Sequence, residues 1–377
     1  MPSLAFATNF LWVMVIGLLG PLLPAMVTDL GITYAQAGFL FTLLSFGSLI
    51  GTSLGAIGSD SLPRKLLYGA CVLLLSICLF LLGVMPRYSL VALFIFLASL
   101  TGSPIGAIGQ SIMLGMFPGK REMYLSYMTF FGAIGSFIAP VVVALNFSAS
   151  LSWRWPFFET AILALIVCVA LLATPIPSAA PLHRPERLAA IVRNRCVLVS
   201  SVLIFFSVGA DLGFSYWLAE YFKSELHVSL RMSSFVVGVY LVGIIMGRIL
   251  VPTFLKRMSA RANLVMGLAV ALASLLPFIL LPSVPLKVGL CALYGFGIGP
   301  VFPLLVARGT REFPSQSGAV TGVLYGCMAL GGMTFPVLVG ALAVSGGIAR
   351  AYLFCAAIVC GLFVASIAGR GPRRRPA

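Results

Sequence analysis

The strongest constraint on this chain is a series of apolar segments, each about 20 residues long, that repeats from its start to its end. We count twelve such segments in 377 residues, and each is long enough to cross about 30 Å of hydrocarbon as a helix. Only 9% of the residues are charged, against about 25% in a soluble protein. The pattern predicts an all-α polytopic membrane protein with twelve transmembrane helices.

The chain also repeats itself once, at an offset of 196 residues. Residues 117–140 and 313–336 both open on Phe-Pro and close on Pro, with Ala and Gly at matching positions between them. A single repeat this long indicates a duplicated domain, and in an apolar chain it is typical of a transporter built from two halves. We therefore expect two six-helix repeats. Four further pairs share the offset: Gly51 and Gly247, Lys65 and Arg261, Pro104 and Pro300, and Phe10 and Phe206.

One stretch interrupts the apolar pattern and predicts the domain boundary. Residues 175–195 contain four prolines and five basic residues, counting one histidine. Such composition indicates a linker. We expect an N-terminal six-helix half at 1–175, a cytoplasmic linker at 176–195, and a C-terminal six-helix half with a basic tail at 196–377.

The basic residues predict the orientation in the membrane. The net charge is +15, and seventeen Lys and Arg residues fall on the side of the linker and both termini, against six on the other side. Because Lys and Arg in short loops stay in the cytoplasm, we expect both termini inside, in the cell inner (plasma) membrane. Membrane topology accounts for the charge, so we expect no nucleic-acid partner. The six outer residues are Arg87, Arg154, Lys223, Arg231, Lys287 and Arg350.

The cysteines and histidines indicate neither a disulfide framework nor a metal site. Eight cysteines are scattered along predicted helices without Cys-x-x-Cys spacing and are typical of apolar packing residues. Both histidines, His183 and His227, fall in predicted loops. We expect no metal, no cofactor and a monomer.

A short charged turn after the second segment carries a resemblance to a known family. Asp60, Pro63, Arg64 and Lys65 resemble the loop 2–3 motif of the major facilitator superfamily, although Ser61 stands where that family usually has a basic residue, and Pro63 replaces a glycine. The resemblance implies a transporter of twelve helices that works by alternating access.

A narrower resemblance is to the fucose and hexose–proton symporter group. Residues 208–221 resemble its seventh helix, and the pairs Gly247-Arg248 and Phe302-Pro303 are similar to its later helices. The group's fucose carrier has proton-carrying carboxylates in helices one and four. Here the first segment has glycines and the fourth has Gln110 instead, so coupling, if present, takes another route.

Two ionisable residues fall deep within predicted helices, where each costs about 2.5–3.5 kcal/mol on insertion scales. Asp211 lies in the seventh segment and predicts a substrate or cation ligand or a proton carrier; the alternative is a structural carboxylate bonded between helices. Arg248 lies nearer the cytoplasmic end of the eighth segment. It is either an anion-binding or gating residue or a cap on a helix end.

The remaining candidates fall into two sets. At the cytoplasmic rim, Asp60, Arg64 and Lys65 are gating candidates, because opposite charges can lock two halves in one state; positive-inside topology alone explains the basic residues. At expected cavity depth, hydrogen-bonding groups and aromatic faces are substrate candidates, with helix packing as the alternative. These are Gln110, Tyr127, Tyr216, Trp217, Tyr240, Phe302 and Tyr325.

These observations predict a secondary transporter that moves a small solute. A sugar-like solute is the first choice, and protons or another coupling ion are the expected partners. The alternatives are efflux of amphipathic compounds or drugs and a transport-incompetent membrane sensor. A membrane-embedded enzyme is disfavoured, because it needs paired acid–base or metal groups.

Overall fold

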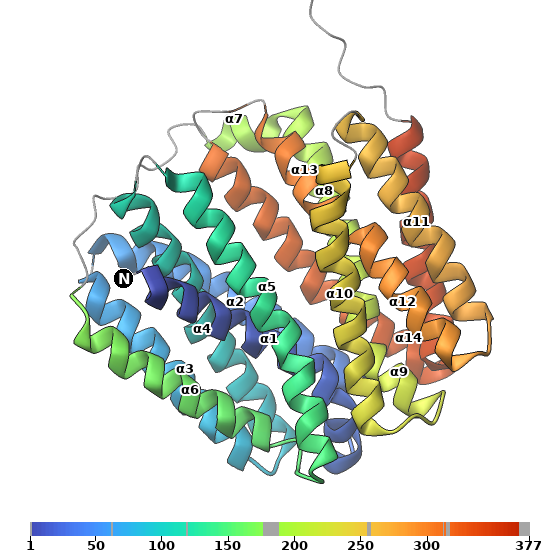
Figure 1. The fold of residues 1–377 in the computed structure, drawn as a ribbon, viewed down its shortest axis with the longest axis horizontal. Helices are drawn as coiled ribbons and strands as arrows, with labels where there is room; N and C mark the ends of the chain where they lie inside the picture. The colour runs from blue at the N-terminus through green and yellow to red at the C-terminus, as the bar shows by residue number, and fades with distance from the viewer. Residues whose placement is uncertain are drawn as a thin grey trace, which may run out of the picture.

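The computed structural model describes residues 2–61, 63–117, 120–175, 188–254, 258–311, 313 and 317–368. Within these ranges the chain forms fourteen helices and no strand (Figure 1). Eleven helical segments are long and apolar enough to cross a membrane. The first six are α1 (Pro2–Leu30), α2 (Tyr34–Ser61), α3 (Arg64–Val84), α4 (Tyr88–Met116), α5 (Arg121–Ser148) and α6 (Trp155–Ala173).

The second group of helices contains two interrupted spans. One breaks between α8 and α9 at Tyr216 and Trp217, and another breaks between α12 and α13 at Gly299 and Pro300. Pro300, which has no backbone N–H to continue the helical ladder, lies at the second break. The group consists of α7 (Leu188–Arg193), α8 (Arg195–Ser215), α9 (Leu218–Ser224), α10 (Leu230–Phe254), α11 (Ala260–Leu280), α12 (Val284–Ile298), α13 (Val301–Thr310) and α14 (Ser317–Ala368).

Helix α14 contains two spans. Its 52 residues would measure about 78 Å as one straight helix, more than twice the hydrocarbon thickness. Gly347 interrupts it with φ 78° and ψ 165°, a conformation that glycine adopts without steric cost. The side chain of Glu225 accepts hydrogen bonds from the N–H groups of Ile348 and Ala349 just beyond the break. The described chain therefore crosses twelve times, and the predicted fold class is confirmed.

The helix packing repeats at the offset seen in the sequence. A Cβ on Gly51 would lie 2.2 Å from the Leu100 carbonyl oxygen, and one on Gly247 would lie 2.2 Å from that of Phe296. Both residues of the second contact stand 196 positions after those of the first. In each half, a helix from the second crossing thus lies backbone to backbone against one from the fourth, as small residues allow in lipid.

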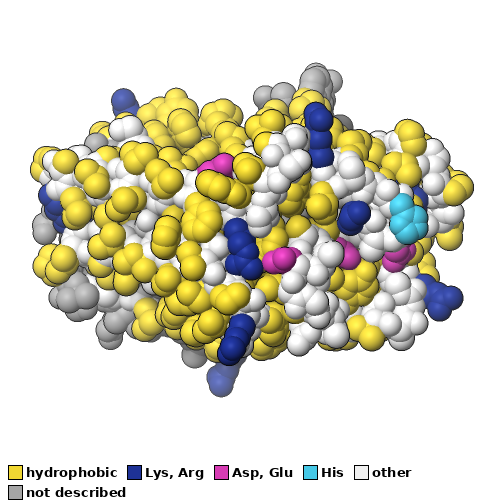
Figure 2. All heavy atoms as spheres, turned by 90° about the horizontal axis from the view of Figure 1, so that it is seen from below, with side chains coloured by type: hydrophobic (Ala, Val, Ile, Leu, Met, Phe, Trp, Pro, Cys, Tyr) yellow, Lys and Arg dark blue, Asp and Glu magenta, His cyan; other side chains and the backbone are white. Residues whose placement is uncertain are grey.

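We name the two ends of the bundle by their residues. The linker end holds the starts of α1 and α8, α7, and the end of α14; the loop end holds the turns at 31–33, 85–87, 149–154 and 225–229 (Figure 1). Figure 2 looks onto the loop end, where a few charged side chains lie among apolar ones.

The two groups of helices meet at the loop end. Tyr34 Oη donates to Glu220 Oε1 at 3.1 Å, and Ser234 Oγ donates to the Pro21 carbonyl at 3.1 Å. Closer to the middle of the bundle, Thr42 Oγ1 donates to the carbonyl of Met333 at 2.6 Å. Among the residues that the structure describes, these are the hydrogen bonds that join the first group to the second. The linker end has no counterpart within the same residues.

Candidate functional site

A cavity of about 210 Å³ lies between the two groups of helices. Helices α1 and α5 form one wall, and α8 and α10 form the other. The loop-end contacts described above lie beyond it. The wall of the first group consists of Val13, Ile16, Gly17, Gly20, Pro21, Ala133 and Ser136. The wall of the second group consists of Asp211, Leu212, Ser215, Tyr216, Val237, Tyr240, Leu241, Ile244, Ile245 and Arg248.

The polar groups of the cavity are unequally divided. The wall of the first group presents one polar side chain, the hydroxyl of Ser136. The opposite wall carries a carboxylate, a guanidinium, two phenols and a hydroxyl. A solute in this cavity would therefore meet an apolar surface on one side and a polar, charged surface on the other. Pockets that bind small molecules commonly combine apolar walls with a few fixed polar groups.

Asp211 is the acidic group of the cavity. It is half-buried on α8, and Tyr240 Oη on α10 donates a short hydrogen bond to its Oδ1. Because Tyr240 is only 1% exposed, packing fixes its ring and therefore the position of the carboxylate. Within the described part of the chain, Oδ2 has no hydrogen-bond donor. One carboxylate oxygen is thus fixed by the protein, and the other is left for a proton or a solute.

Arg248 is the basic group of the cavity and is exposed. Its Nε donates to the Gly299 carbonyl at 3.2 Å, at the end of α12. The two terminal nitrogens have no hydrogen-bond or ion-pair partner among the described residues. Arg248 interacts electrostatically with Asp211, but the two side chains are not in ion-pair contact.

Tyr216 lies where the cavity meets the loop end. It caps the end of α8, and its ring stacks on Phe41 of α2 with centroids 4.3 Å apart and planes at 16°. Phe41 is fully buried. This contact joins the two groups of helices, so the floor of the cavity is also part of the loop-end contact.

Trp217, the next residue, seals the loop end and does not line the cavity. It is fully buried; its Nε1 donates to the Pro336 carbonyl at 2.9 Å, and its ring meets the edge of Tyr34 at 5.4 Å. Because the helix is interrupted between α8 and α9, the side chains of Tyr216 and Trp217 point to different surroundings. One faces the cavity and the other packs the second half against the first.

Four other predicted candidates lie outside the cavity lining. Gln110 on α4 is exposed, and Tyr127 on α5 is 46% exposed with its ring near that of Phe6. Phe302 and Tyr325 meet edge to face at 5.4 Å. Tyr325 interacts electrostatically with Arg248 of the cavity lining. Their role in substrate binding stays a prediction.

The rim candidates are described only in part. The Asp60 side chain lies outside the described residues. Arg64 is 8% exposed at the start of α3, and Lys65 beside it is half-buried. The proposed charge lock at this rim stays a prediction.

Sequence reasoning missed two buried ionisable residues near the loop end. Glu220 is 4% exposed; one oxygen accepts the hydrogen bond from Tyr34, and Oε2 has no partner among the described residues. Lys287, expected in an outer loop, is 2% exposed and donates to Tyr221 Oη at 2.6 Å and to the Phe278 carbonyl. Both lie within a few residues of a predicted helix end, where charge is ordinarily solvated. For Glu220 the available signal was the surrounding aromatic run, residues 216–222; the sequence around Lys287 offers none.

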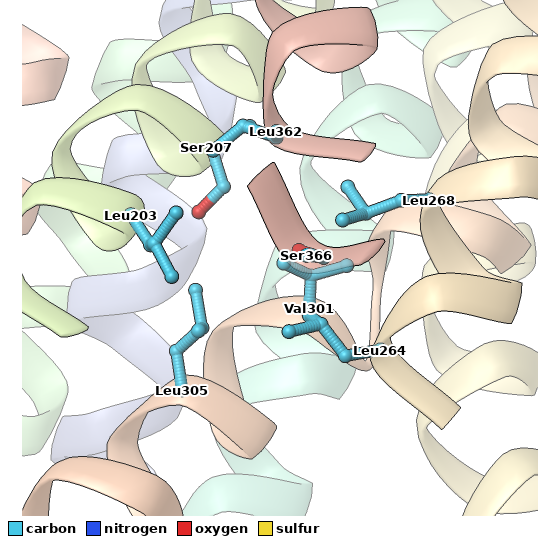
Figure 3. A pocket seen from close by; sticks show the side chains of 8 residues that line it. All are labelled: Leu203, Ser207, Leu264, Leu268, Val301, Leu305, Leu362 and Ser366. Atoms are coloured by element: carbon cyan, nitrogen blue, oxygen red, sulfur yellow. The ribbon is translucent and has the colours of Figure 1, made fainter. Parts of the chain in front are cut away.

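A second, smaller crevice carries no site. It lies among α8, α11, α13 and α14, and Figure 3 shows mostly aliphatic side chains pointing into it, with the hydroxyls of Ser207 and Ser366 as the polar groups. It has no room for a water molecule.

Comparison with known proteins identifies the family. The sequence pattern of the Major Facilitator Superfamily matches residues 5–336. The chain belongs to this superfamily. It is therefore an integral membrane protein and a secondary transporter of small solutes, which such proteins bind within the membrane.

Relatives and solved structures agree with this assignment. The chain is 22% identical to the MFS-type transporter YfkL of Bacillus subtilis (strain 168), over 86% of this chain and 83% of the relative. It is 23% identical to a TsgA homologue of Citrobacter koseri, over the same shares.

Two crystal structures have the same fold. A mutant of the nucleoside transporter NupG superposes with a TM-score of 0.81 at 19% identity, covering 97% of this chain and 99% of that one. A bacterial homologue of the human lysosomal transporter Spinster, inward-facing and unoccupied, gives 0.79 at 15% identity, covering 97% and 95%.

Proposed function

We propose that this transporter carries a small hydroxylated, sugar-like solute in the cavity between α1, α5, α8 and α10, by alternating access. The observation that carries the proposal is the free Oδ2 of Asp211 in a cavity of about 210 Å³. A carboxylate oxygen accepts hydrogen bonds from hydroxyl groups, and Tyr216 and Ser136 in the lining add further partners. NupG, which shares the fold, is a nucleoside transporter. Nucleosides contain a hydroxylated ring, so this likeness supports the solute class.

We propose further that the two halves, 1–175 and 196–377, rock against each other about the cavity. The hydrogen bonds between the described parts of the halves cluster at the loop end, which supports a state open towards the linker end. Charge asymmetry supports a cytoplasmic linker and cytoplasmic termini, in a monomer of the inner membrane. The structure then corresponds to an inward-facing state, the state named for the Spinster homologue.

Asp211 is our candidate for the coupling residue, with protons as the coupling ion. It is the acidic side chain of the cavity lining, and a transporter needs one group that both sides reach in turn. Gln110 occupies the fourth helix, where the fucose carrier has a carboxylate, so coupling through α8 replaces that route.

The test is transport into proteoliposomes with and without a pH gradient. Asp211→Asn keeps size and hydrogen bonding but removes the titratable proton. If Asp211 carries the proton, the variant loses gradient-driven accumulation and retains counterflow exchange, which needs no net proton release. Glu159→Gln is the matched control, because Glu159 is a carboxylate on α6 bonded to Asn146 and is not part of the cavity lining.

Three results would contradict the coupling role. Loss of both accumulation and exchange would make Asp211 a substrate ligand without a part in coupling. Normal accumulation by Asp211→Asn would show that transport and coupling do not need its titratable proton. A wild-type protein that equilibrates solute but never concentrates it would establish a facilitator.

Efflux of amphipathic compounds is a second candidate, favoured by one observation. The wall from α1 and α5 is apolar except for one hydroxyl, and such a wall suits a hydrophobic ring or chain. Transport in inside-out vesicles distinguishes the two candidates. An efflux protein accumulates an amphipathic dye there, whereas an uptake protein does not.

A further inference from the structure

The guanidinium of Arg248 is the strongest unexplained feature of the cavity. A charged group within a membrane is costly and ordinarily pairs with another group. Among the described residues, the Arg248 side chain has one hydrogen bond, from Nε to the Gly299 carbonyl. The terminal nitrogens lack a hydrogen-bond or ion-pair partner in the part of the chain that the structure describes, and the side chain is exposed in the cavity lining.

The direction of α10 places this group towards the solute. Helix α10 runs from the loop end to the linker end, and helical side chains tilt towards the N-terminus of their helix. Arg248 stands eight residues after Tyr240 on this helix, and its Nε is held at the end of α12 by the Gly299 carbonyl. Those eight residues correspond to about 12 Å along the axis. Asp211 is hydrogen-bonded to Tyr240 and therefore lies closer to the loop end. Arg248 lies closer to the linker end.

The nearby acid does not form an ion pair with Arg248. Asp211 and Arg248 interact electrostatically, yet they are not in ion-pair contact. A planar guanidinium with two free nitrogens is the side chain best matched to a carboxylate or phosphate, because it forms two parallel hydrogen bonds. Both residues line the same cavity, so one solute can reach both.

We propose that the solute is an organic anion: a hydroxylated acid whose carboxylate pairs with the Arg248 guanidinium while a hydroxyl at its other end donates to Asp211 Oδ2. This inference rests on the proposed function and narrows its solute class from sugars to sugar acids and related hydroxy acids. The solute lies along the cavity with its anionic end towards the linker side. This orientation also keeps the negative charge away from the Asp211 carboxylate.

The charge of Arg248 then determines specificity. A neutral sugar of the same size keeps the hydrogen bonds to Asp211 and loses the pairing with Arg248. Hydrogen bonds to charged groups contribute enough that we expect about a tenfold preference for the acid over its neutral counterpart. An amino sugar of the same skeleton brings a positive charge towards Arg248 and binds more weakly than either.

The experiment uses matched six-carbon solutes that differ in charge: hexoses, the corresponding hexuronates and hexonates, and hexosamines. Binding to the purified full-length protein is measured as a shift in thermal stability, and uptake is measured in proteoliposomes. We expect wild type to prefer acids about tenfold. Arg248→Gln abolishes this preference and keeps binding of the neutral hexose, whereas Arg248→Lys retains part of the preference because the positive charge remains.

A matched control separates specificity from structure. Arg261 also donates to carbonyl oxygens at a helix end, through Nε to Ser366 at 3.1 Å, but it does not line the cavity. Arg261→Gln should keep the preference for acids. If Arg248 acts only as a gate or a helix cap, Arg248→Gln lowers transport of acid and neutral solute equally, which overturns the inference.

The remaining outcomes separate this inference from the proposed function. Equal or better binding of neutral hexoses by wild type refutes the anion and leaves the sugar-like transporter standing. Failure of every member of the panel to bind or be transported refutes the hydroxylated solute class, and this inference with it.

Discussion

The hydrogen bond between Tyr34 and Glu220 offers the sharpest test of alternating access. It joins α2 to α9 at 3.1 Å and exists only while the loop end is closed. A hydrogen bond to a charged group contributes about 1.5–3 kcal/mol, against about 0.5–1.5 kcal/mol for a neutral one. Since about 1.4 kcal/mol changes an equilibrium tenfold, Tyr34→Phe should raise the ratio of loop-open to loop-closed molecules by about ten- to a hundredfold.

A double-mutant cycle isolates this bond from other effects of the substitutions. Glu220→Gln retains an acceptor for Tyr34 but removes the charge, so the effect of Tyr34→Phe should fall to the neutral range of about 0.5–1.5 kcal/mol in that background. The assay is the rate of maleimide labelling at Ala219→Cys, in a chain whose native cysteines are replaced. Ala219 is fully buried in the closed loop end, so labelling reports the open fraction.

The control is another tyrosine at the same end. Tyr88 Oη donates to the Gln36 carbonyl at 3.1 Å, and both residues belong to the first half. Tyr88→Phe should therefore leave labelling near the wild-type rate. Equal labelling of the Tyr34→Phe and Tyr88→Phe proteins would refute the reasoning, as would a cycle in which the two single effects simply add.

Three further predictions concern packing, a buried charge and topology. Gly247→Ala should lower thermal stability in detergent, since its Cβ would meet the Phe296 backbone and overpacking costs about 1–3 kcal/mol. Gly361→Ala, with nothing within 4 Å, should be neutral or stabilising. Lys287→Ala should cost about 2–4 kcal/mol, because it leaves a cavity and unpaired oxygens; unchanged melting would contradict this. A reporter active only in the cytoplasm should give signal when fused after Ala377, and signal only from an external reporter would reverse the proposed orientation.

Much of the fold was predictable from apolar length and from the repeat. Twelve crossings follow from segment length, and the offset of 196 recurs in the contacts of Gly51 and Gly247. The breaks were harder to locate, because a broken helix remains apolar throughout. Gly299-Pro300 is visible as a sequence signal, whereas the break at Tyr216 has none, although the next residue, Trp217, is fixed by a hydrogen bond to the Pro336 carbonyl of α14.

The charged residues of the candidate site were predictable, because charge is scarce within the apolar segments. Asp211 and Arg248 were recognised because a charge far from both helix ends is rare, and both line the cavity. Tyr216 and Tyr240 were grouped with Gln110, which lies outside the lining, because sequence alone does not say which face of a helix turns inward. Glu220 was missed since its burial arises from contact between the halves.

The backbone contacts at Gly51 and Gly247 also determine where bending is impossible. Two helices that touch through their main chains cannot slide or tilt relative to each other without steric overlap, so each pair moves as one rigid unit. The two halves must therefore move relative to each other at contacts that are made through side chains. The contact of Phe41 with Tyr216 is one of these. A larger residue at such a side-chain contact would alter the rate of the transport cycle, whereas a larger residue in place of either glycine would force its two helices apart.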